Sequence, residues 1–264
     1  MKTLGQFFVL LALFFGTYFG LSRIDWVTLL KIERVSRDTE ENLGDLLWKK
    51  ISNSEQVIEN PEIQQPVDSL VQLLCNANGI KRKVQVHIIR SNELNAFALP
   101  AGHLVVYSGL IAVCDDESEL LGVLGHEIGH MERKHVMKKL TKEIGLSVLI
   151  SAGTSGKGSA PVRQALKVLS SAAYDRGLEA DADRSSVQYL LKAGADPEGL
   201  ALILDKITAQ QETQPEYTEW LSTHPDTETR VQAIRKSLEG KHYTKNHLVD
   251  TSYWKGLKTA VALL

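Results

Sequence analysis

Residues 120–140 of the chain read LLGVLGHEIGHMERKHVMKKL, an apolar stretch that turns abruptly basic. Apolar residues recur at helical spacing before the first histidine, so the pattern predicts a buried helix. Asp115, Asp116 and Ser118 are suitable N-cap residues. Acidic residues near the start and basic residues near the end also suit the helix dipole. We therefore expect one continuous helix from this cap through about Leu140.

The histidines of this stretch predict a metal site. His126 and His130 are four residues apart, so on a helix they lie on the same face and both imidazoles can reach one ion. Zinc binds neutral imidazole readily, and a catalytic zinc site keeps one position open for water. Glu127 is rotated by about 100° around the helix axis. From there it can reach such a water and take its proton as a general base.

An ordinary amphipathic helix that carries two solvated histidines is the alternative interpretation. The apolar residues around the motif predict a buried helix instead, and buried histidines need partners. Gly125 and Gly129 stand in the helix interior, where each costs about 1 kcal/mol relative to alanine. That cost is understandable if another backbone or a substrate must approach closely.

A catalytic zinc needs a third protein ligand. Arg133 and Val136 stand where a metzincin has glycine and histidine, so that class is excluded, and His135 has the wrong spacing. Glu179 and Asp183 are four residues apart on a predicted helix. Glu179 is the best candidate for the third ligand, and Asp183 for a group that accepts a hydrogen bond from the outer nitrogen of a ligand histidine. From spacing alone, a solvent-exposed acidic helix face is an equally good interpretation of these two residues.

The rest of the chain predicts a mainly helical α+β domain with a small sheet. Alternating apolar and polar residues predict a strand at 83–91, and two more strands are expected at 96–99 and 104–107 with a bend between them. The Gly/Ser-rich stretch 151–161 predicts a mobile loop, either a lid or a passive connector. Further helices are predicted at about 67–80, 162–173, 178–193, 197–211 and 225–238.

The N-terminus carries the clearest topological signal. Residues 4–22 contain no formal charge and have about the length needed to cross a bilayer core as a helix. No Ala-x-Ala-like site closes the stretch, which favours a retained anchor over a cleaved secretory signal. The expected organisation is a signal anchor or signal peptide at 1–22, a juxtamembrane helical region at 23–60, a domain that carries the predicted zinc site at 61–240 and a C-terminal tail at 241–264.

The composition is that of an ordinary globular protein, with 43% hydrophobic and 23% charged residues. A formal net charge of -2 gives no electrostatic basis for binding nucleic acid. Cys75 and Cys114 belong to no Cys-x-x-Cys pair, so no disulfide framework is expected. Whether these two cysteines form a single bridge is left open by the sequence.

Several motifs, in order along the chain, resemble one family. The similarity is to the membrane-associated gluzincin zinc peptidases that include HtpX, the CAAX prenyl proteases and the BepA/LoiP-like branch, and it is closest to that last branch. It covers roughly residues 84–234 and implies a zincin-like fold, zinc endopeptidase activity and one Zn²⁺ per chain. It also implies His126, His130 and Glu179 as ligands, Glu127 as general base and Asp183 beside a ligand histidine. The motifs are HEIGH at 126–130, RGLEADADR at 176–184, NAFALPAGHLVVYSGLI at 95–111 and STHPDTETRVQAI at 222–234.

The same resemblance places His224 near the metal. It implies either a catalytic role in stabilising the developing oxyanion or a fourth, inhibitory ligand of a latent form. From the residues alone, His224 before Pro225 can equally well do no more than open a helix. Arg230 either pairs with an active-site acid or stays solvated. Ser185 and Ser186 replace a glycine that is usual in the family, a change that affects helix packing and no ligand.

Peptidases of this sort often bind an extended peptide by adding it to an exposed sheet edge. Asn95, Ala96 and Phe97 are the candidate edge strand. The leading hypothesis is a single-pass protein of the bacterial inner membrane with its catalytic domain in the periplasm; a soluble periplasmic form after signal cleavage is the alternative location.

Its expected activity is hydrolysis of misfolded or misassembled envelope proteins, bound as unfolded or extended polypeptides, by Glu127-assisted attack of zinc-bound water. Single-pass topology argues against prenylated substrates. The alternative function is a latent or low-turnover, zinc-stabilised, chaperone-like binding protein of the envelope.

Overall fold

The structure is a computed structural model that describes residues 6, 11, 15–16, 37–155, 159–211 and 219–264. The signal anchor predicted for residues 1–22 therefore lies almost entirely outside the described part of the chain. Within that part, no helix combines the length and apolar character that crossing a bilayer would need. The membrane-spanning segment stays a prediction from the sequence.

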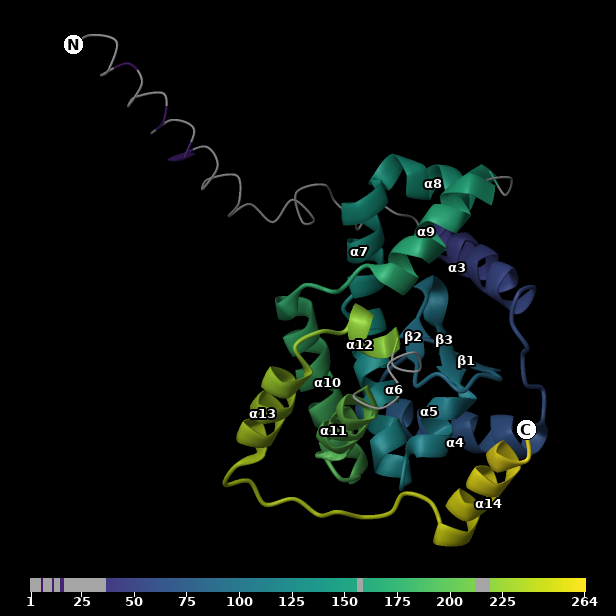
Figure 1. Ribbon diagram of the computed structural model, residues 1–264, viewed down its shortest axis with the longest axis vertical. Coiled ribbons are helices and arrows are strands. Elements are labelled where there is room, and N and C mark those ends of the chain that lie inside the picture. Colours follow the sequence, from purple (N-terminus) through teal and green to yellow (C-terminus); the bar gives the residue numbers. More distant parts are fainter. Residues whose placement is uncertain (1–5, 7–10, 12–14, 17–36, 156–158, 212–218) are drawn as a thin grey trace.

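The centre of the fold is helix α6 (Glu117–Glu132), which is buried along nearly its whole length. Helices α4 (Pro61–Asn78), α10 (Arg176–Ala193) and α11 (Gly199–Gln211) pack around it (Figure 1). Small residues make this close packing possible, because a Cβ atom added at Gly122 would collide with the backbone of Leu200 on α11. A Cβ atom added at Gly129 would lie 2.9 Å from the Cβ of Ser185 on α10. The helix glycines thus serve the close approach of neighbouring helices, as their energetic cost indicated.

A small sheet lies beside α6. Its three strands are β1 (Gln85–Ile89), β2 (Ala96–Ala98) and β3 (His103–Tyr107), in the spatial order β1-β3-β2. β1 is parallel to β3 and β2 is antiparallel to it, so the short β2 lies at the edge of the sheet. The strand predictions are confirmed. The 3₁₀ turn η2 (Pro100–Gly102) makes the bend between β2 and β3, with Ala101 and Gly102 in left-handed conformation.

The prediction of one helix through Leu140 is wrong, because α6 ends at Glu132 and α7 (His135–Ile144) begins in a new direction. Lys134 lies between them at φ 56°, a left-handed conformation that interrupts the helical path. Next to it, Arg133 Nε donates to Ser185 Oγ at 2.9 Å. This contact with α10 holds the turn in place. Because the contact joins distant parts of the chain, no local sequence pattern predicts the turn.

The prediction of a mobile loop over residues 151–161 is also wrong for the residues that the structure describes. Residues 151–155 belong to helix α8 (Leu146–Ser155), and residues 159–161 belong to helix α9 (Ser159–Ser171). Residues 156–158 lie outside the described residues. Small residues here serve packing: a Cβ atom added at Gly153 would lie 2.6 Å from Cγ2 of Thr39 on α3 (Arg37–Ser52). Neighbouring Ala152 is buried.

The segment predicted as a C-terminal tail contains helix α14 (Thr251–Ala262), which packs against α4 and against α5 (Ser108–Val113) (Figure 1). Trp254 and Leu257 are buried there, and Trp254 Nε1 donates to the carbonyl of Asp115 at 2.8 Å. Cys75 and Cys114 are both buried and free, so they form no bridge. With α12 (Glu219–Thr223) and α13 (Thr227–Leu238), the described chain forms a mainly helical α+β fold with a small sheet.

Candidate metal centre

Helix α6 presents the two histidines of the HEIGH motif in the interior of the protein. Its N-terminus is capped by Asp116, whose Oδ1 accepts from the backbone N–H groups of Ser118 and Glu119 at 2.9 and 3.1 Å. His126 and His130 are both fully buried, and their Nε2 atoms lie 3.0 Å apart. The two imidazoles therefore point at one common place, as their spacing on the helix predicts.

Helix α10 brings Glu179 to the same place. Its Oε1 lies 3.3 Å from Nε2 of His130, and its Oε2 lies 3.6 Å from Nε2 of His126. The close packing of α10 on α6 makes this possible, and Ser186 Oγ ties the helices together by donating to the carbonyl of Gly122 at 2.6 Å. Glu179 is thus buried next to the histidines. The alternative interpretation, in which Glu179 lies on a solvent-exposed acidic helix face, is wrong.

His224 completes the cluster from the chain that follows α12. Its Nδ1 lies 3.0 Å from Glu179 Oε1 and 3.2 Å from His126 Nε2, and its side chain is buried. Its backbone N–H donates to the carbonyl of Trp220 at 2.9 Å, which fixes its position at the end of α12. Four donor atoms, one each from His126, His130, Glu179 and His224, all lie within 4.8 Å of one another.

The outer nitrogen of His126 shows which nitrogen of that ring carries the proton. His126 Nδ1 lies 2.9 Å from Asp183 Oδ1, a carboxylate that can only accept, so the proton sits on Nδ1 and the lone pair on Nε2. Burial lowers the pKa of His126 and lowers that of His130 to about 4, which keeps both rings neutral. His130 Nδ1 faces Nδ1 of His135 at 3.0 Å.

This arrangement fits a divalent cation. Two neutral imidazole lone pairs and a carboxylate converge in a buried place, where their mutual repulsion is relieved by a shared positive ion. Burial alone would raise the pKa of Glu179, but the imidazoles of His224 and His130 hold it well below its usual range. A zinc ion prefers this donor set of histidine nitrogens and a carboxylate oxygen.

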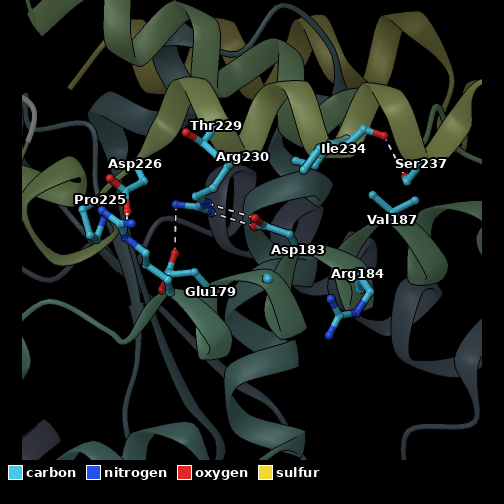
Figure 2. A pocket seen from close by; sticks show the side chains of 13 residues that line it. Glu179, Asp183, Arg184, Val187, Pro225, Asp226, Thr229, Arg230, Ile234 and Ser237 are labelled. Atoms are coloured by element: carbon cyan, nitrogen blue, oxygen red, sulfur yellow. Dashed lines mark hydrogen bonds and ion pairs between the residues drawn. The ribbon is translucent and has the colours of Figure 1, made fainter.

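A buried arginine supports the acidic side of the cluster. Arg230 of α13 places Nη1 2.9 Å from Glu179 Oε2 and Nη2 2.7 Å from Asp183 Oδ1 (Figure 2). Its Nε donates to the other oxygen of Asp183 at 2.9 Å. The alternative of a solvated Arg230 is therefore excluded. A cavity of about 280 Å³ with largely apolar walls lies between α10 and α13, and Figure 2 shows these ion pairs along its wall.

Glu127 lies on the side of the cluster that faces the sheet. Its Oε2 accepts from the backbone N–H of Ala98 on β2 at 3.1 Å, and its Oε1 accepts from Trp220 Nε1 at 3.3 Å. His224 Nε2 lies 3.5 Å from the same Oε1. Burial raises the pKa of Glu127 to about 8. The carboxylate thus stands between the donor cluster and the edge strand β2.

Sequence reasoning missed two neighbours of the cluster. Trp220 stacks on His224 with ring centroids 4.5 Å apart, and no helix was predicted from the sequence around it. His135 was set aside because five residues separate it from His130 on the expected helix. Tyr174 also lies beside the cluster, buried with its ring centroid 4.1 Å from that of His130. His135 is not one of the four clustered donors, in agreement with its spacing, but the left-handed Lys134 brings its ring next to that of His130.

The fold and this donor set define a metallopeptidase class in which an HExxH helix is completed by a carboxylate from a second helix. The chain belongs to peptidase family M48, because the family model described as "Peptidase family M48" matches residues 58–238. This membership confirms the resemblance found in the sequence motifs.

Named relatives agree with the family. The chain is 28% identical over 214 residues to the "Beta-barrel assembly-enhancing protease" of Yersinia pestis, a match that covers 76% of this chain and 44% of that protein. It is 28% identical over 209 residues to the protein of the same name from Escherichia coli strain K12, covering 74% and 43%. It is also 26% identical over 248 residues to "Metalloendopeptidase OMA1, mitochondrial" of Danio rerio, covering 86% and 52%. The matches to the first two relatives span less than half of their length.

Proposed function

We propose that this protein is a zinc-dependent metalloendopeptidase with one Zn²⁺ per chain. His126, His130 and Glu179 are the proposed ligands, and Glu127 is the proposed general base. The observation that carries the proposal is the convergence of these donor atoms within 4.8 Å at a place bordered by Glu127 and the edge strand β2. A bound zinc supplies a Lewis acid that polarises a carbonyl and lowers the pKa of a coordinated water.

The residues around the ion then have separate proposed roles in hydrolysis. The Ala98 N–H and the Trp220 indole orient the carboxylate of Glu127, so it can accept a proton at the sheet side and return it to the leaving amine. Asp183 fixes the tautomer of His126 and keeps its Nε2 lone pair directed at the ion. Arg230 holds both carboxylates in place.

We propose that Asn95, Ala96 and Phe97 bind the substrate as an added strand at the sheet edge. β2 pairs only with β3 among the described strands, and its last residue contacts Glu127. A cavity of about 350 Å³ adjoins the same strand and is lined by Asn95 and Phe97, by Leu166 of α9 and by Thr223 next to His224. This cavity is our candidate for receiving substrate side chains.

The proposal is tested by cleavage of casein, an unfolded protein, by the full chain. We expect cleavage that stops when a zinc chelator is added and resumes when zinc is restored. Strand addition uses backbone hydrogen bonds, so the cleavage sites should share no single residue and a tightly folded substrate should resist. Cleavage that ignores the chelator would exclude the metalloendopeptidase.

The second candidate function, a latent or low-turnover binding protein, is favoured by the position of His224. With Nδ1 of His224 as a fourth protein ligand, the ion would be closed to water, as in structural zinc sites. We propose that this closed form is a latent state of the peptidase. His224→Ala is then expected to raise the rate of casein cleavage several-fold at unchanged zinc content. A fall in rate would instead assign His224 to oxyanion stabilisation.

We further propose that the substrates are misfolded or misassembled envelope proteins and that the protein is anchored in the bacterial inner membrane with this domain in the periplasm. The apolar stretch 4–22 supports the anchor, and the name of the first relatives, which refers to β-barrel assembly, supports substrates that arise in protein assembly. A reporter fused after residue 30 tests it: activity of a cytoplasmic reporter at that position would contradict the proposed orientation.

A further inference from the structure

His135 stands directly behind one of the proposed ligands. Its Nδ1 lies 3.0 Å from Nδ1 of His130, and the two rings meet edge to face with centroids 5.0 Å apart. Only 1% of the His135 surface is exposed, and none of the His130 surface. The donor cluster formed around the proposed metal does not include His135, so its contact with the centre passes through His130.

The donors and acceptors at this contact permit one assignment. The Nε2 atom of His130 faces the donor cluster and must carry a lone pair there, so the proton of the neutral ring sits on Nδ1. A 3.0 Å contact between two Nδ1 atoms needs one N–H and one lone pair. His135 must therefore present its lone pair at Nδ1 and carry its own proton on Nε2.

The turn between α6 and α7 creates this contact. On an unbroken helix, residues five apart point about 140° away from each other, so His135 would face away from His130. The left-handed Lys134 changes the direction of the chain and turns His135 back beneath the ligand. The turn is fixed by Lys134 N–H donating to the Met131 carbonyl at 3.0 Å and by Arg133 bonding to Ser185.

We propose that His135 is a positioning residue for the metal centre. Its Nδ1 accepts the Nδ1–H of His130 and so fixes the tautomer and orientation of that ligand. This inference rests on the metal centre proposed above. It makes the two histidine ligands unequal: His126 is backed by the charged carboxylate of Asp183, whereas His130 is backed by a neutral imidazole. A carboxylate raises the basicity of its histidine more than a neutral acceptor does.

The test compares two substitutions in the full chain. His135→Phe keeps an aromatic ring but has no acceptor, whereas the Oδ1 of His135→Asn can accept from His130 at about the place of Nδ1. Zinc affinity is measured by competition with a chromophoric chelator. We expect His135→Phe to bind zinc about 10–100-fold more weakly than the wild type and His135→Asn to stay within a few-fold of it. The melting temperature of the metal-free proteins serves as the folding control.

Each outcome is decisive. Wild-type zinc affinity in His135→Phe, or an equal loss in both variants, would overturn the proposal. If a variant fails to fold, ¹⁵N NMR of the zinc-loaded wild type decides, since it should show protons on Nδ1 of His130 and Nε2 of His135. A proton on Nδ1 of His135 would overturn the assignment. A wild type that binds no zinc would instead refute the metal centre itself.

Discussion

Replacing Glu127 with glutamine is expected to lower the kcat for casein cleavage by about 10²–10⁴-fold, the usual contribution of a positioned general base. The amide has nearly the shape of the carboxylate and can still accept from Ala98 or Trp220, but it cannot take up a proton. Because Glu127 is not among the clustered donor atoms, zinc content should stay at that of the wild type.

The control for this experiment is Glu132→Gln at the end of the same helix. Glu132 is exposed and pairs with Arg82 at 3.2 Å, away from the cluster, so cleavage should be unaffected. Activity that survives Glu127→Gln would remove the peptidase mechanism as proposed. Loss of activity together with loss of zinc would show that Glu127 holds the ion instead.

The sequence predicted the parts of the centre that depend on local geometry. His126, Glu127 and His130 lie on one short helical segment, so their relative positions follow from 3.6 residues per turn and need no knowledge of the rest of the fold. The three strands were also predicted from local signals: the first from alternation with a period of two, and the other two from apolar segments on either side of the Pro100–Gly102 bend. The edge position of β2 depends on strand order, which alternation alone does not give.

Local sequence patterns did not predict the parts of the centre that depend on contacts between distant segments of the chain. Spacing could not decide whether Glu179 was buried, because that depends on how closely α10 packs on α6 through Gly129 and Ser185. The missed helix end is a second case: nothing in MERKHV signals a left-handed Lys134, a conformation that costs a non-glycine residue roughly 1–2 kcal/mol. Tertiary contacts such as Arg133 with Ser185 offset that cost, and they appear only once the chain is folded.

Replacing Arg230 with methionine is expected to destabilise the metal-free protein by about 3–5 kcal/mol, because removing one partner leaves buried charge uncompensated. Arg230 is 6% exposed and is the cation that faces both Glu179 and Asp183 at 2.7–2.9 Å. Methionine keeps the apolar stem without the charge. The free energy of unfolding at neutral pH, from urea denaturation, measures the effect.

Arg235 on the same helix provides the matched control. Its ion pair with Asp205 is about half exposed, so Arg235→Met should cost no more than about 1 kcal/mol. Added zinc should recover part of the stability lost in Arg230→Met, since an ion bound to Glu179 supplies positive charge next to the carboxylate that has lost its arginine. Equal losses in the two variants would mean that the buried carboxylates do not need Arg230. A large loss that zinc fails to reduce would mean that Arg230 acts mainly through Asp183, on the side of the cluster away from the ion.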